Sequence, residues 1–268
     1  MNNFTSLLIF ETKKFFKPFL IFSTIWMLMI FLFMSFFDSI KQNAQQIIDL
    51  YASFPKELLQ AVGKDSTSIT NIYGYVGSAI MLYLFLSGCI LVIFVVSNSL
   101  SQEISNHNIL FLLSKPISRL KIYTAKFFAI FINIVLSDLL LFLSLVVSIK
   151  ILTKETEVDY HIFILIFLAL FILQFFFMSV AELIGAKLNS GKTTAIVSFL
   201  IILSYLFNLI SGMSENAGFL KYISPNFYVG LEKISETREL KFENIAIIVL
   251  AIGLIIVGGY LFKNKDIE

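Results

Sequence analysis

Residues 127–149 read FFAIFINIVLSDLLLFLSLVVSI and contain one charged side chain, Asp138. About 20 apolar residues in a helix cross the ~30 Å hydrocarbon core of a bilayer, so this stretch predicts a transmembrane helix. Five further apolar stretches have similar length, at residues 18–37, 75–96, 162–181, 195–213 and 245–262. The sequence therefore predicts an all-α membrane protein with six transmembrane helices.

The composition of the whole chain agrees with this fold class. Hydrophobic residues make up 58% of the 268 residues and charged residues only 14%, whereas a soluble domain carries roughly 25% charged residues. The connections between the apolar stretches are too short to fold alone, so residues 1–268 are predicted to form a single transmembrane domain. The net charge of +2 is too small to indicate a nucleic-acid partner.

The distribution of lysine and arginine predicts the orientation. Segments 1–17, 101–126, 182–194 and 263–268 carry 11 basic and 5 acidic residues, a net charge of +6. Segments 38–74, 150–161 and 214–244 carry 9 basic and 12 acidic residues, a net charge of −3. Basic residues beside transmembrane helices stay in the cytoplasm. The protein is therefore predicted to lie in the cell membrane with both termini in the cytoplasm.

Residues 1–17 have the pattern of an amphipathic helix. At 100° per residue, Phe4, Leu7, Leu8 and Phe15 share one face, and the lysines at 13, 14 and 17 lie opposite them. We expect an interfacial helix with its lysines toward anionic headgroups. The alternative is a plain positive flank to the first span.

The segment 101–126, SQEISNHNILFLLSKPISRLKIYTAK, connects the second and third spans. It contains the apolar run Ile109–Leu113, and Pro116 disfavours helix at the residue before it. We expect a short surface helix ending near Ser114, and a second helix that Ser118 caps. An exposed apolar ridge on such a helix indicates a partner protein.

This loop resembles that of the ABC-2 type permeases, the six-span membrane subunits of ATP-binding-cassette exporters. Their loop has a Glu, an apolar run with Leu-Leu, a Pro-x-Ser-Arg sequence and a Lys before the next span. The matching residues here are Glu103, Leu112, Leu113, Pro116, Ser118, Arg119 and Lys126. His107 and Asn108 depart from the family, which commonly has Gly-Thr at these positions.

The resemblance implies that the loop contains a coupling helix on which a separate ABC ATPase docks. The docking residues it implies are Glu103, Ile109, Leu110, Leu113, Pro116 and Arg119. ATP and Mg would bind to that ATPase, with no cofactor in this chain. The resemblance also implies a homodimer, or a heterodimer with a related permease, surrounded by membrane lipids.

The segment 214–244 precedes the last span and is aromatic and apolar at its start. The resemblance implies short helices here that re-enter the outer leaflet and help to close the exit, with Pro225, Phe227 and Tyr228 as outer gate candidates. Irregular backbone at that depth requires burial in protein or contact with water. The alternative is an ordinary surface loop.

Nothing in the sequence predicts catalysis by this chain. Residues 190–194, SGKTT, lack the upstream glycine spacing of a nucleotide-binding loop, so we interpret them as a polar turn. The apolar stretches contain one carboxylate and no histidine, which argues against an intramembrane enzyme. His107 and His161 are far apart in sequence, and no metal site is expected.

Asp138 is the one residue in a predicted span whose charge makes insertion into the bilayer energetically costly. Asn133, Ser137, Ser144 and Ser148 form a polar stripe beside it. Two interpretations remain open: Asp138 faces a transport pathway or subunit contact, or it pairs with a neighbouring span through Gln174 or Asn208.

The predicted function is that of the membrane subunit of an ATP-driven exporter. The aromatic, uncharged spans favour amphipathic or hydrophobic cargo, such as peptides, antimicrobials or lipid-like molecules. The alternative is a membrane immunity or scaffold protein that binds partners without transport.

Overall fold

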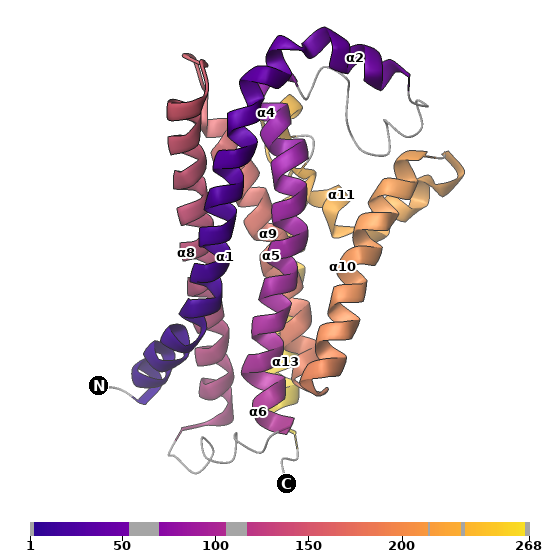
Figure 1. Ribbon diagram of the computed structural model, residues 1–268. Helices are drawn as coiled ribbons and strands as arrows, with labels where there is room; N and C mark the ends of the chain where they lie inside the picture. Colours follow the sequence, from indigo (N-terminus) through magenta and orange to yellow (C-terminus); the bar gives the residue numbers. More distant parts are fainter. Residues whose placement is uncertain (1–2, 54–69, 106–116, 214, 232–233, 266–268) are drawn as a thin grey trace.

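The computed structural model of the chain describes residues 3–53, 70–105, 117–213, 215–231 and 234–265. Within these ranges the regular structure is entirely helical, and six helices are long and apolar enough to span a membrane (Figure 1). They are Phe4–Gln42, Ile72–Ser101, Arg119–Leu152, Tyr160–Gly185, Ser190–Met213 and Glu243–Lys263. The six predicted spans are thus confirmed, and each helix extends beyond its apolar stretch at one end or both.

The first span belongs to one long helix, α1 (Asn3–Gln42), which has Pro18 in its interior. The predicted interfacial helix is therefore continuous with the first span. Figure 1 shows the first turns of α1 inclined to the rest of the helix. Proline removes a helical hydrogen bond and clashes with the preceding turn of the helix. Pro18 therefore accounts for the change of direction between the first turns and the rest of α1. A short helix, α2 (Ala44–Ala52), follows.

The second span combines several helical segments in one continuous run. In order, they are α4 (Ile72–Tyr75), the π-helical turn η2 (Val76–Ile80), α5 (Met81–Val96), the π-helical turn η3 (Ser97–Ser101) and α6 (Gln102–Ser105). Asn71 begins the run, and its side chain accepts a hydrogen bond from the Tyr73 amide. Because α6 is the start of the 101–126 loop, the second span leads into that loop without a break.

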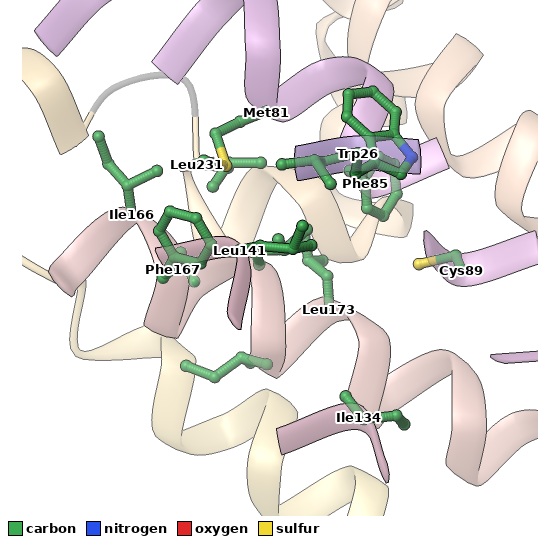
Figure 2. Packing of buried hydrophobic residues seen from close by; sticks show 14 of the residues in the cluster. Trp26, Met81, Phe85, Cys89, Ile134, Leu141, Ile166, Phe167, Leu173 and Leu231 are labelled. Atoms are coloured by element: carbon green, nitrogen blue, oxygen red, sulfur yellow. The ribbon is translucent and has the colours of Figure 1, made fainter. Parts of the chain in front are cut away.

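The third and fourth spans are α8 (Arg119–Leu152) and α9 (Tyr160–Gly185). Ser118 occupies the N-cap position of α8, as predicted, although its side chain makes no capping hydrogen bond. The most apolar window of α9 is 72% buried, which makes α9 the central helix of the bundle. Figure 2 shows Leu173 of α9 in one cluster with Trp26 of α1, Phe85 of α5 and Leu141 of α8.

The last part of the chain contains α10 (Ser190–Met213) and α13 (Glu243–Lys263). Between them lie the 3-10 helix η4 (Glu215–Ile223) and the short helices α11 (Pro225–Val229) and α12 (Ile234–Thr237). α10 is peripheral, with 17% of its most apolar window buried, and Figure 1 shows it leaning away from α5. The predicted polar turn at 190–194 is wrong: these residues begin α10, and the Asn189 side chain accepts a hydrogen bond from the Lys192 amide.

Both termini lie at the same end of the bundle, where α1 begins and α13 ends (Figure 1). We call this the terminal end, and the opposite end the distal end. α6 ends and α8 begins at the terminal end, whereas α11 lies toward the distal end. Glu103 and Arg119, the two predicted docking residues that the structure describes, therefore lie at one end, and the outer gate candidates lie toward the other.

Candidate functional site

A buried ion network joins three helices at the terminal end. Lys126 of α8 is fully buried, and its Nζ lies 2.7 Å from Glu11 Oε1 of α1 and 2.7 Å from Glu103 Oε2 of α6. Glu11 is 1% exposed and Glu103 is 14% exposed. Lys14, which is partly exposed, contacts the other oxygen of Glu103. Two ammonium groups thus balance two carboxylates, which is the condition under which buried charges are tolerated.

The helical period explains why Glu11 is buried. Leu7, Glu11 and Phe15 follow one another at intervals of four residues, so they lie on one face of α1, and all three are buried. Leu7 packs in a cluster with Ile122 of α8 and Phe262 of α13. The predicted apolar face of residues 1–17 is therefore in contact with protein, and Glu11 lies in the middle of it. Lys126 is the cation that α8 presents to that face.

Glu182 of α9 adds a third carboxylate beside this network. It is fully buried, and neither of its oxygens has a hydrogen-bond partner among the residues that the structure describes. Glu182 interacts electrostatically with Lys126 and with the buried Tyr123. The ion pairs therefore link α1, α6 and α8 around Lys126, and the charge of Lys126 also acts on the Glu182 carboxyl group of α9.

The chain's last described residues fasten the start of α8. The Arg119 guanidinium donates hydrogen bonds to the carbonyls of Lys263 and Lys265. Lys265 Nζ in turn donates to the carbonyls of Ala186, 3.1 Å away, and Lys187, 3.2 Å away, just after α9. Partial burial lowers the pKa of the Lys265 ammonium. Arg119 thus has a structural role in joining α8 to α13, in addition to any contact with a partner.

The predicted docking residues divide into two groups. Glu103 and Arg119 lie at the two ends of the loop and are held by the contacts above. Ile109, Leu110, Leu113 and Pro116 lie outside the described residues, and so does the rest of the predicted coupling helix. Glu11, Lys14 and Glu182 were not predicted from the sequence as site residues. The signal for Glu11 is its position between Leu7 and Phe15 on an apolar face.

Inside the bundle, Asp138 pairs with Gln174. Gln174 Nε2 of α9 donates to Asp138 Oδ1 of α8 over 3.4 Å, and the two residues are 3% and 9% exposed. The amide also lies against Gly88 of α5, where a Cβ atom would come within 2.9 Å of Nε2. Of the two partners considered for Asp138, Gln174 is therefore the one in contact. Asn208 instead lines a small cavity near the distal end.

The polar stripe of α8 is its contact surface with α1. Asn133 Nδ2 donates to the Thr12 carbonyl over 3.1 Å, and Ser137 Oγ lies 2.7 Å from Ser23 Oγ. Small polar residues let membrane helices approach closely and hydrogen-bond across the interface. Asn133 is thus a packing residue between these two helices.

The outer gate candidates lie beside the middle of α10. Pro225 is the first residue of α11, and Ser224, directly before it, donates to the Ser204 carbonyl over 2.8 Å. Ser204 precedes the end of α10 by nine residues, about 13 Å of helix. Phe227 lines a cavity of about 50 Å³ together with Asn208, and Lys241 Nζ donates to the Phe227 carbonyl over 3.1 Å. Tyr228 donates its hydroxyl to the Tyr222 carbonyl.

The described residues contain no group of three or more His, Cys, Asp or Glu arranged to hold a metal ion. The arrangement can transmit movement. The ion network and the Arg119 contacts connect the two ends of one loop to the spanning helices α1, α8, α9 and α13. These features define a multi-pass helical membrane protein in which the described residues on either side of one loop, Glu103, Arg119 and Lys126, contact other helices of the bundle.

A comparison with protein families matches residues 12–267 to the ABC-2 family transporter protein family. The match covers nearly the whole chain, so this protein belongs to that family, whose members are membrane transport subunits that are not themselves catalytic. Searches of curated proteins and of solved structures gave no match. Such permeases normally work with an ABC ATPase, which defines the kind of partner to expect.

Proposed function

We propose that this chain is the membrane subunit of an ATP-driven exporter that moves amphipathic or hydrophobic cargo out of the cell. A separate ATPase, which binds ATP and Mg, docks on the 101–126 loop. Two permease chains, either identical or related, form the pathway. The terminal end lies in the cytoplasm, the distal end outside, and the inclined first turns of α1 lie in the headgroup layer of the cell membrane.

The observation that carries this proposal is the shared ion network at the two ends of the loop. Glu103 lies before the apolar run and Lys126 lies after it, and the two are in contact. A force applied to the loop by an ATPase therefore reaches α1 through the Lys126–Glu11 ion pair and α13 through the Arg119 hydrogen bonds. Packed helices joined by buried ion pairs move as units, which suits a domain that must change the access of a pathway.

The contacts of α11, toward the distal end, support the proposal that the outer exit opens and closes. α11 begins beside the middle of α10, and its Asn226 Nδ2 lies 3.4 Å from Ser204 Oγ. Around the start of α11 the Ser224 amide donates to the Lys221 carbonyl and the Phe227 amide to the Ser224 carbonyl, so these backbone groups have partners in the protein, as a re-entrant segment requires. We propose that Pro225, Phe227 and Tyr228 close the outer exit and open when the helices move.

The test of docking is the double variant Leu110→Asp and Leu113→Asp. Buried apolar anchors supply most of the energy of such contacts, so charges at both positions should abolish co-purification of the ATPase that the wild-type chain carries from its native membrane. The matched control is Phe242→Asp, an equally polar change at an exposed apolar residue before α13, toward the distal end. The control should retain the ATPase in full.

Three results would count against the proposal. Stoichiometric ATPase in the double variant would remove the docking assignment. Wild-type protein that carries no ABC ATPase would remove the transport class. A reconstituted complex whose ATPase activity no amphipathic peptide or hydrophobic drug stimulates would instead favour the scaffold alternative.

A further inference from the structure

An apolar groove of about 360 Å³ lies between α8 and α9, away from the ion network at the terminal end. Its walls are phenyl rings and aliphatic side chains, and Asp138 is the single charged residue that lines it. The volume falls within the range of small-molecule sites, roughly 300–1,000 Å³. The groove is therefore large enough for a ligand and contains one polar group that can orient it.

The phenyl rings are arranged as two pairs along the groove. Phe131 of α8 meets Phe171 of α9 edge to face, with ring centroids 5.6 Å apart. Phe142 meets Phe167 in the same way, with centroids 5.5 Å apart. Asp138 lies between the two pairs in the α8 sequence, seven residues after Phe131 and four before Phe142. The carboxyl group is thus flanked by aromatic rings on both sides along the groove.

Asp138 has unused capacity to accept a hydrogen bond. Gln174 occupies Oδ1, whereas Oδ2 is without a hydrogen-bond partner among the described residues. A buried acceptor left unpaired in an apolar setting is costly, so a donor that reaches Oδ2 is stabilised there. A cationic donor gains most, because it also neutralises the carboxylate.

We propose that this groove binds an amphiphile with a protonated amine head and an apolar tail. Oδ2 is itself buried, so the Asp138 carboxyl group turns toward the groove when the amphiphile binds; the ammonium then donates to Oδ2 and lies near the phenyl rings, which attract cations through their electron-rich faces. The tail lies along the aliphatic side chains of the groove. A neutral alcohol gains only part of this interaction, and a carboxylate or sulfate head is repelled by Asp138. The site does not require the ATPase, so it stands independently of the proposed transport function.

The test uses the full chain in phosphatidylcholine nanodiscs, with binding to empty nanodiscs subtracted. Radiolabelled dodecylamine is the probe, and dodecanol and dodecanoate are the neutral and anionic comparators. Wild-type protein should bind dodecylamine at least about tenfold more tightly than dodecanol, and dodecanoate most weakly. Asp138→Asn should bring the amine-to-alcohol ratio close to one. Asp138→Glu should retain most of the preference.

Aromatic variants separate the rings from the carboxylate. Phe142→Leu combined with Phe167→Leu should weaken amine binding several-fold more than alcohol binding, because the cation–π contribution is lost while the aliphatic volume is largely kept. Phe199→Leu is the control, since Phe199 is 62% exposed on α10, outside the groove. It should leave both affinities unchanged.

Alcohol binding and the melting temperature report whether each variant is folded. If wild-type protein binds the three amphiphiles equally, the groove holds only lipid chains and the proposal is wrong. If Asp138→Asn stays folded and retains the preference for the amine, the carboxylate is not the recognition group and the proposal is equally overturned.

Discussion

Lys126 is the residue whose ion pairs hold the helices together at the terminal end. One buried ammonium contacts carboxylates from two other helices, at residues 11 and 103, and interacts with a third at residue 182. Buried ion pairs of this kind favour one arrangement of the helices that they join, because a buried charge that loses its partner is costly. The same network that supports the loop therefore also fixes how α1, α6 and α8 meet.

Replacement of Lys126 by methionine should destabilise the protein strongly. The change keeps the side-chain length but leaves Glu11 and Glu103 without their shared cation, and breaking a buried pair in this way costs about 3–5 kcal/mol. The measurement is thermal unfolding of the purified protein in detergent or nanodiscs.

The control for that measurement is Lys121→Met, the same substitution on the same helix at an exposed position. Surface substitutions away from buried networks change stability by about 0.5 kcal/mol or less, so its melting temperature should match the wild type. Equal melting of the two variants would show that the ion network contributes little to stability.

At the scale of helices, α13 packs closely against α8 and α9 at Gly258. A Cβ atom at Gly258 would come within 3.2 Å of Leu183 Cα in α9 and 2.6 Å of the Tyr123 hydroxyl in α8. The first contact is with backbone, which cannot move aside as a flexible side chain can. The glycine thus sets the distance between α13 and α9, as small residues do in other membrane bundles.

Gly258→Ala should therefore destabilise the protein, by about 1–3 kcal/mol if the overpacking resembles that in other well-packed cores. Gly253→Ala is the matched control on the same helix, because a Cβ atom there meets nothing within 4 Å. Alanine has the higher helix propensity, so the control should lose no stability. Thermal unfolding of both variants checks this, and a loss confined to Gly253→Ala would contradict the packing argument.

For the whole molecule, both termini lie at one end of the bundle, and the distribution of charge predicts the direction of insertion. The segments assigned to the terminal end carry a net charge of +6, and those assigned to the distal end −3. A bilayer retains basic segments on the cytoplasmic side. The ion network would then lie where an ATPase can reach the loop.

Cysteine labelling tests this orientation in intact cells. In a Cys89→Ser background, Glu236→Cys should react with a membrane-impermeant thiol reagent added outside, and Lys187→Cys should react only after the cells are opened. Both positions are exposed, so access to the reagent depends on the side of the membrane. The reverse pattern would overturn the predicted orientation, and with it the docking of an ATPase at the terminal end.

The sequence by itself determined the number of spans, the location of the loop and the family. These follow from local properties: the length of each apolar stretch, the lysines beside it, and the residues from Glu103 to Lys126 that resemble one family. The predicted ends of the helices were less accurate than their number. Polar residues such as those at 190–194 form the first turn of a helix when the residue before them caps it, as Asn189 does for α10.

Only the tertiary structure decided which polar groups meet. Glu11 and Lys126 are 115 residues apart in sequence, and Asp138 and Gln174 belong to different helices. In an apolar span, the hydropathy pattern is nearly the same on every side of the helix, so it does not say which face turns toward which neighbour. That rotation is set by side-chain packing between helices, and it alone made Glu11 part of a buried network and Asp138 part of a groove.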